Sequence, residues 1–205
     1  MHRPRPVLTT VAVLLLVLTI ALALDARVAG WAVHWRQPAL DMVVGILNPI
    51  GSGVTLLVTC LSLALLGHWR TRSRLRDTAW VGALGFASAG LVEFAIKHLV
   101  GRARPDGAPH GILLTGPTFA PDLDSFPSGH ATSVFAVAAV FAACYPRLAW
   151  PLYLLATAIA VGRVYLARHY VSDIMAGATI GIAVAWLLLG HPHVRHRLAA
   201  HDLGR

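Results

Sequence analysis

Charged side chains are scarce in this sequence. Only 13% of its 205 residues are Asp, Glu, Lys or Arg, while 57% are hydrophobic, and the chain holds a single lysine, Lys97, and a single glutamate, Glu93. Soluble domains carry about 25% charged residues. The composition therefore excludes an ordinary soluble protein. The length suits one domain, residues 1–205, with the membrane as its expected solvent.

Cysteine is also rare. The two cysteines, Cys60 and Cys144, both lie inside apolar runs. A thiol in such surroundings behaves as a small hydrophobic side chain. We infer neither a disulfide nor a metal site from them.

The hydrophobic residues gather in six long runs. A helix needs about 20 residues to cross the hydrocarbon of a bilayer, and the runs lack the alternation that is typical of barrel strands. The sequence therefore predicts an all-α polytopic bundle of six transmembrane helices. The expected spans are residues 7–24, 53–67, 78–100, 130–145, 148–166 and 174–189. The first run could instead be a secretory signal, but it exceeds the ~7 to 15 residues of a signal core.

The formal net charge of +8 is explained by where the arginines lie between the spans. With six spans, ten of them fall on one side, which the positive-inside rule makes cytoplasmic, with both chain termini. Attraction to anionic lipid then accounts for these charges without a nucleic-acid partner. The ten are Arg3, Arg5, Arg70, Arg72, Arg74, Arg76, Arg147, Arg195, Arg197 and Arg205.

Seven basic residues remain on the other face of the predicted bundle. Two of them, Arg27 and Arg36, are expected in an outer loop with tryptophans. The other five lie in two of three segments that the chain direction brings to one membrane face, residues 97–105, 126–130 and 162–173. The sequence therefore predicts a shared, hydrated site at the extracytoplasmic face of the cell membrane.

Phosphate is the natural ligand of such a site. Lys97, Arg104 and Arg163 are positive groups, and arginine matches the paired oxygens of a phosphate. The segment FPSGH opens the fourth span, where Gly129 allows close backbone approach and the free N–H groups of a helix start favour an anion. Phosphate recognition alone would also suit a transporter or a lipid-flipping protein.

Two histidines add reactive groups to this face. The imidazoles of His130 and His169 can attack a substrate and donate a proton near pH 7. Asp173 lies four residues after His169, a spacing that lets its carboxylate orient the ring. Simpler alternatives exist for each residue: Asp173 could only cap a helix, either histidine could be an interfacial residue, and Lys97 could extend from the end of its span toward water.

These residues resemble the type 2 phosphatidic acid phosphatase family, which shares a three-part signature. Its first part, a lysine, six residues and Arg-Pro, is present at 97–105, and its second, Pro-Ser-Gly-His, at 127–130. The third part is Ser-Arg, five residues, His, three residues and Asp; it is present at 162–173 with Gly162 in place of the serine. Family members hydrolyse phosphate esters or anhydrides, commonly of lipids, without a metal or other cofactor.

The resemblance implies a role for each matching residue. His169 would be the nucleophile that forms a phosphohistidine, Asp173 would hold its ring, and His130 would protonate the departing oxygen. The phosphoryl oxygens would be bound by Lys97, Arg104, Ser128, Gly129 and Arg163. A vanadate-dependent haloperoxidase has a similar anion site, but such enzymes are typically soluble and much longer.

Glu93 stands four positions before Lys97 inside the third span. An ionisable group at that depth usually faces a partner or a cavity. We predict that the two residues pair on one helix face and that Glu93 supports Lys97, although Glu93 could instead bond to another helix. The expected substrates are phosphatidic acid, phosphatidylglycerol phosphate or undecaprenyl diphosphate, and the sequence predicts no oligomeric state.

Overall fold

All regular elements in the described part of the computed structural model are helices, as predicted. It describes residues 5–107 and 114–200, so Arg3, Arg205 and part of the loop after Lys97 lie outside the described residues. The helices are α1 (Arg5–His34), α2 (Pro38–Ile50), α3 (Gly53–Trp69), α4 (Ser73–Val100), α5 (Gly129–Cys144), α6 (Ala149–Tyr165), α7 (Val171–Gly190) and α8 (Pro192–Ala199). Two 3₁₀ turns span Pro105–Gly107 and Pro146–Leu148.

The number of membrane spans depends on how two features are counted. Within the described ranges, α1, α4, α6 and α7 are long and apolar enough to cross a membrane, and the bent pair α2 and α3 would make a fifth span. Helix α5 is apolar but only 16 residues long, about 24 Å against a hydrocarbon thickness of about 30 Å. All six predicted runs are helical, and the count of six spans stays a prediction.

The region predicted as an outer loop between the first two spans is mostly helix. Helix α1 continues past its apolar run to His34, and α2 follows at Pro38. Pro49, near the end of α2, cannot donate a helical hydrogen bond. The chain bends by 55° between α2 and α3, so the two helices are not one straight span. Ser52 then caps α3 by accepting a hydrogen bond from the Thr55 amide at 3.2 Å.

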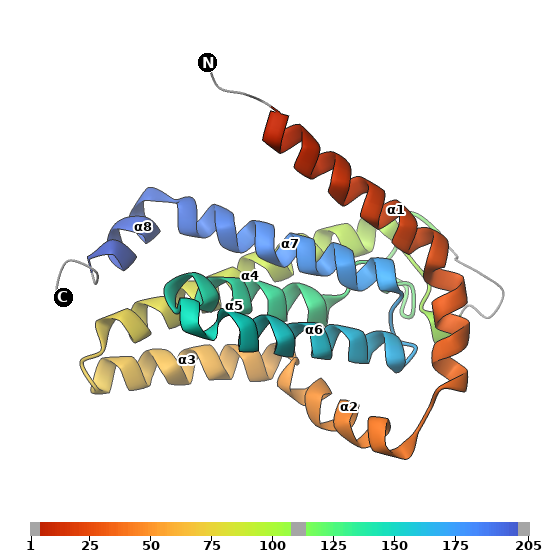
Figure 1. Cartoon of the computed structure of the whole chain (residues 1–205), viewed down its shortest axis with the longest axis horizontal. Helices are drawn as coiled ribbons and strands as arrows, with labels where there is room; N and C mark the ends of the chain where they lie inside the picture. Colours follow the sequence, from red (N-terminus) through yellow and green to blue (C-terminus); the bar gives the residue numbers. More distant parts are fainter. Residues whose placement is uncertain (1–4, 108–113, 201–205) are drawn as a thin grey trace.

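Helix α5 lies at the centre of the bundle, in contact with α3, α4, α6 and α7 (Figure 1). Two glycines of α7 allow its close approach: a Cβ on Gly177 would lie 2.7 Å from the Ser128 carbonyl oxygen, and one on Gly181 only 2.4 Å from that of Thr132. Small residues at helix contacts are typical of membrane bundles. The core around α5 is accordingly rich in buried alanine.

Helix α1 lies at the edge of the bundle. It packs against α6 and α7. Its N-terminal half diverges from the other helices, and its C-terminal half crosses the end where α6 ends and α7 begins (Figure 1). This crossing places the middle of α1 beside the predicted phosphate site.

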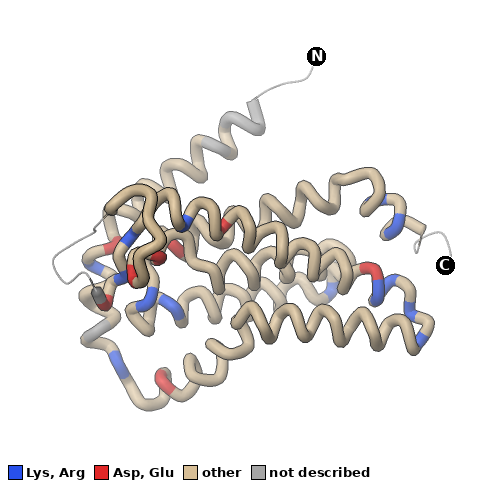
Figure 2. The backbone as a smooth tube through the Cα atoms, turned by 180° about the vertical axis from the view of Figure 1, so that it is seen from behind, with Lys and Arg blue, Asp and Glu red and all other residues tan. Residues whose placement is uncertain are grey.

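The two ends of the bundle differ in charge. Lys and Arg dominate the end with the α3–α4 turn and α8, while acidic and basic residues mix at the other (Figure 2). At the arginine-rich end, Arg74 donates to the Cys144 carbonyl at 2.6 Å, which joins the start of α4 to the end of α5. Cys144 is buried at this end, and Cys60 is buried in the nearby core, packed against Ala64 and Phe141.

Candidate active site

The three predicted segments meet at the end of mixed charge. The Ser128 amide donates to the Asp173 carbonyl at 3.0 Å. The His169 ring bonds to the Ser125 carbonyl at 2.8 Å. Arg102 donates to the Asp173 carboxylate at 2.5 Å. The predicted convergence of residues far apart in the sequence is therefore confirmed.

His169 is held in one orientation, in the short turn between α6 and α7. Its side chain is only 3% exposed, and its Nδ1 lies 2.8 Å from the Ser125 carbonyl oxygen. A carbonyl can only accept, so Nδ1 carries the ring proton and Nε2 keeps its lone pair. Burial lowers the pKa of His169, while Asp173 acts in the opposite direction. The ring is therefore neutral near pH 7, with a lone pair on Nε2 that can act as a nucleophile.

The Asp173 carboxylate acts on this ring at a longer distance than the sequence suggested. Its Oδ2 lies 3.6 Å from His169 Nδ1, while it accepts from Ser125 Oγ at 2.6 Å and from the Tyr170 amide at 2.8 Å. The bond from Tyr170 caps α7, so the capping alternative also holds. The nearer partner of the ring is a backbone carbonyl, and the carboxylate supplies negative charge behind it.

A second aspartate, Asp25 of α1, completes a buried ionic network. Arg102 bridges the two carboxylates, because its Nη2 lies 2.8 Å from Asp25 and its Nη1 lies 2.5 Å from Asp173. Asp25 also accepts from the Ser172 amide at 3.0 Å and from the Ser172 hydroxyl at 2.5 Å. The sequence analysis missed Asp25, although a carboxylate directly after an apolar run was a usable signal.

Lys97 is paired as predicted. Its Nζ lies 2.5 Å from Glu93 Oε1, one helical turn earlier on α4. The carboxylate of Glu93 reaches the start of α5, where a Cβ on Gly129 would lie 3.2 Å from the same oxygen. Because Gly129 has no side chain, the Glu93 carboxylate can lie beside the predicted anion site. Whether Glu93 supports Lys97 in a reaction remains a prediction.

Arg104 forms a two-point ion pair with Asp124, a residue that the sequence analysis did not select. Its Nε and Nη2 donate to the two carboxylate oxygens at 2.7 and 2.9 Å. The guanidinium lowers the pKa of Asp124 to about 2. A phosphate bound at Arg104 must share this guanidinium with Asp124 or take its place.

Among the predicted catalytic and phosphate-binding residues, three carry buried polar atoms with no hydrogen-bond partner in the described part of the chain: Ser128 Oγ, His130 Nε2 and Arg163 Nε. Most buried polar atoms in proteins are hydrogen-bonded, so each such exception calls for an explanation. Another nitrogen of Arg163 does have a partner, the side-chain oxygen of Asn48 on α2. The Ser128 hydroxyl, the Arg163 Nε–H and a protonated His130 ring can each donate a hydrogen bond to an oxygen of an anionic ligand.

The glycine at the place of the signature's serine has a packing reason. A Cβ on Gly162 would lie 3.3 Å from Val44 Cγ1 on α2. A serine there would press against that helix. The bent pair α2 and α3 also packs on the site at Gly51, where an added Cβ would lie 3.3 Å from the His130 ring.

Comparison with known proteins gave matches of several kinds. The family model described as the PAP2 superfamily matches residues 78–197. The lipid A 1-phosphatase of Rhizobium johnstonii is 35% identical over 134 residues, which are 61% of this chain and 52% of that protein. Phosphatidylglycerophosphatase B of Bacillus subtilis is 29% identical over 185 residues, 81% of this chain and 82% of that protein.

A solved structure shares the fold. The crystal structure of the transmembrane PAP2 type phosphatidylglycerolphosphate phosphatase from Bacillus subtilis superposes with a TM-score of 0.66 at 24% identity, over 87% of this chain and 94% of that chain. By contrast, the chain spans 52% and 63% of the length of the two rhizobial lipid A 1-phosphatases that it matches.

Proposed function

This chain belongs to the PAP2 superfamily, and we propose that it is an integral membrane phosphatase. In this proposal it hydrolyses a lipid phosphate or diphosphate, without a metal, at the extracytoplasmic face. One observation carries it: the neutral, oriented ring of His169 lies in one site with three buried polar atoms that lack a partner, on Ser128, His130 and Arg163. The names of the relatives, which are lipid phosphatases, support the same class of reaction.

The first step transfers the phosphoryl group to His169. Its Nε2 lone pair forms a bond to phosphorus while the bond from phosphorus to the leaving oxygen breaks. His130 donates a proton to that oxygen, so the lipid leaves as an alcohol or, from a diphosphate, as a monophosphate. The Ser125 carbonyl keeps the proton on Nδ1, which directs Nε2 at the substrate.

The second step hydrolyses the phosphohistidine. His130, now neutral, takes a proton from a water molecule as its oxygen bonds to phosphorus. The phosphorus–nitrogen bond breaks, its electron pair returns to Nε2, and inorganic phosphate leaves. Both histidines then have their starting protonation.

The phosphoryl oxygens carry the charge that develops in both steps. Lys97, Arg104 and Arg163 supply positive charge, while the Ser128 hydroxyl and the amides at the start of α5, including that of Gly129, can donate hydrogen bonds. Preorganised donors of this kind stabilise a transition state because they need no rearrangement during the reaction. Glu93 and Asp124 would hold Lys97 and Arg104 until the substrate binds.

A lipid substrate is supported by an apolar cavity of about 370 Å³ beside the site. The cavity lies between α1, α4 and α7 and includes Ile96, next to Lys97, and Phe126, which directly precedes Pro127 and Ser128. Its volume is in the range of ligand pockets. A hydrocarbon chain could rest there while its phosphate is held at the start of α5. Its lining is Leu14, Leu15, Val17, Leu18, Ile96, Phe126, Met175, Ala176, Thr179 and Ile180.

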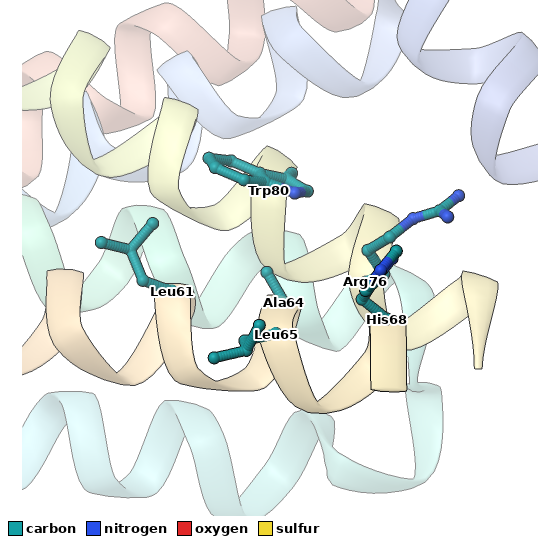
Figure 3. Close-up of a pocket in the computed structure, with 6 residues that line it drawn as sticks. All are labelled: Leu61, Ala64, Leu65, His68, Arg76 and Trp80. Carbon is teal, nitrogen blue, oxygen red and sulfur yellow. The ribbon is translucent and has the colours of Figure 1, made fainter. Parts of the chain in front are cut away.

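A second cavity, of about 380 Å³, has the wrong position for this role. It lies between α3 and α4 near the arginine-rich turn, while Lys97 is at the far end of α4. That helix has 28 residues, a length of about 42 Å. Trp80 on the cavity wall precedes Lys97 by 17 residues of α4, about 26 Å, so this cavity does not adjoin the site. It is lined by Leu61, Ala64, Leu65, His68, Arg76 and Trp80 (Figure 3).

Phosphate release from purified protein in detergent tests the proposal. The substrates are phosphatidic acid, phosphatidylglycerol phosphate, undecaprenyl diphosphate and a soluble phosphomonoester, all with EDTA. We expect release from at least one lipid, inhibition by vanadate, and a loss of at least about 10³-fold in kcat for His169→Ala. A strict metal requirement, or intact transport of labelled lipid that persists in His169→Ala, would contradict the proposal.

A further inference from the structure

We infer that Asp25 of α1 is a positioning residue for the reaction, acting through Arg102 to fix the Asp173 carboxylate behind the nucleophilic ring of His169. The inference rests on the proposed phosphatase function. Asp25 lies outside residues 78–197, which the family model matches. It reaches the site only because α1 crosses the end of the bundle (Figure 1).

The three charges are fully enclosed. Asp25 and Asp173 have side chains that are 0% exposed and Arg102 one that is 2% exposed. The guanidinium also stacks on the Tyr170 ring, 4.1 Å from its centroid. Charged groups in such surroundings persist only when paired and hydrogen-bonded. The bridge therefore fixes the position of Asp173 against two rigid elements, the start of α7 and the middle of α1.

Asp25 also fixes the backbone of the first turn of α7, which follows His169. It accepts hydrogen bonds from the amide and the hydroxyl of Ser172, the residue before Asp173. The same hydroxyl accepts from Arg102 at 2.7 Å. One carboxylate of α1 thus ties down both the first turn of α7 and the guanidinium that contacts Asp173.

The charge balance gives Asp25 an electrostatic effect on His169. Two carboxylates and one guanidinium leave one net negative charge behind the ring. When Nε2 is phosphorylated and Nδ1 keeps its proton, the ring becomes positive, and this charge stabilises it. The groups that act on the ring are Asp173 and the Ser125 carbonyl, opposed by Arg163 and Arg104. Without the Asp25 charge, Arg102 neutralises Asp173 more completely and the ring becomes less basic.

The test is Asp25→Asn, which keeps the side-chain shape and removes the charge, assayed on the lipid that the wild-type protein hydrolyses best. We expect kcat to fall by about 10- to 100-fold, as for other groups that orient a reacting ligand from behind, with KM unchanged within about twofold. The acidic limb of the pH profile of kcat/KM should move to lower pH, because a less basic ring is protonated only at lower pH.

The matched control is Asp77→Asn, another buried aspartate, paired with Arg76 at 2.8 Å near the arginine-rich end. It should reduce thermal stability without moving kcat or the pH profile. A double-mutant cycle with Arg102→Lys adds a second readout: the losses in kcat should be less than additive, because both changes act on Asp173.

Three outcomes separate the hypotheses. If the wild-type protein hydrolyses nothing in the panel, the proposed function fails. If it is active and folded Asp25→Asn keeps wild-type kcat and pH profile, the positioning role is wrong. If Asp25→Asn does not fold, Arg102→Lys decides alone: an unchanged kcat in a folded Arg102→Lys protein would overturn the inference.

Discussion

The sequence predicted individual residues of the site better than it predicted their partners. Three signature segments at fixed spacing identify Lys97, His130 and His169, since those positions are determined along the chain. The partners of the site arginines could not be identified in this way, because Asp25, Asn48 and Asp124 meet Arg102, Arg163 and Arg104 only through tertiary contacts. No periodicity or spacing encodes such pairs. The Ser125 carbonyl, which orients the proposed nucleophile His169, is a backbone group, so the residue type does not reveal this contact.

The protonation of His169 predicts the pH dependence of the reaction. Burial lowers the pKa of its ring below the ordinary value of 6.5, so the neutral, nucleophilic form persists as the pH falls below 6.5. Activity is lost when the pH falls through this lowered pKa, and it is lost again as the pH rises and His130 loses its proton. We expect a bell-shaped profile of kcat/KM with its acidic limb below pH 6.5. An acidic limb at pH 7 or above, measured between pH 4 and 9 with chemistry rate-limiting, would contradict the assignment.

Whole elements were predicted well where they are apolar and poorly where they are interrupted. The six runs are all helical, but α2 was expected to be loop, because Pro38, Pro49 and Gly51 break its apolar pattern within 14 residues. The helical end of α1 was missed for a related reason. Its buried Asp25 looks like the end of a span until its partner Arg102 is known.

The cavity between α1, α4 and α7 predicts how chain length affects activity. Thr179 lies on its wall and is exposed toward it, so Thr179→Trp should fill part of the volume. We expect KM for a long-chain lipid phosphate to rise by about tenfold, because the hydrocarbon loses buried area, while kcat/KM for a soluble phosphomonoester stays within about twofold. Thr157→Trp, the same change on the exposed face of α6 away from this cavity, is the control. Equal effects of the two variants on both substrates would rule out a tail site here.

At the scale of the whole molecule, the distribution of charge along the sequence predicted which segments lie at the same end of the bundle. The arginines of the α3–α4 turn and of α8 gather at one end of the bundle, and the site lies at the other end, where basic and acidic residues mix (Figure 2). A charge bias fixes the direction of a bundle in the membrane but gives no packing of its helices. The central place of α5 could not be predicted, because the composition of its 16-residue helix does not say which other helices it contacts.

Membrane sidedness can be measured with two single-cysteine variants. Ala120→Cys lies at the end of the active site and Ala200→Cys at the arginine-rich end, and both positions are exposed. The native cysteines are buried and should stay unlabelled. In intact cells an impermeant maleimide should label Ala120→Cys and spare Ala200→Cys, because the positive-inside rule places the arginine-rich end in the cytoplasm. The reverse pattern would place the active site in the cytoplasm.

The tight contact between α5 and α7 has a consequence for the two histidines. His130 opens the first of these helices, and His169 lies just before the second. Gly177 and Gly181 of α7 lie directly against backbone atoms at the start of α5. If α7 moved along α5, larger side chains of α7 would collide with these peptide groups. The contact between α5 and α7 therefore fixes the distance between the start of α5, which carries His130, and the start of α7, which follows His169, while the Ser125 carbonyl in the loop before α5 sets the orientation of the His169 ring.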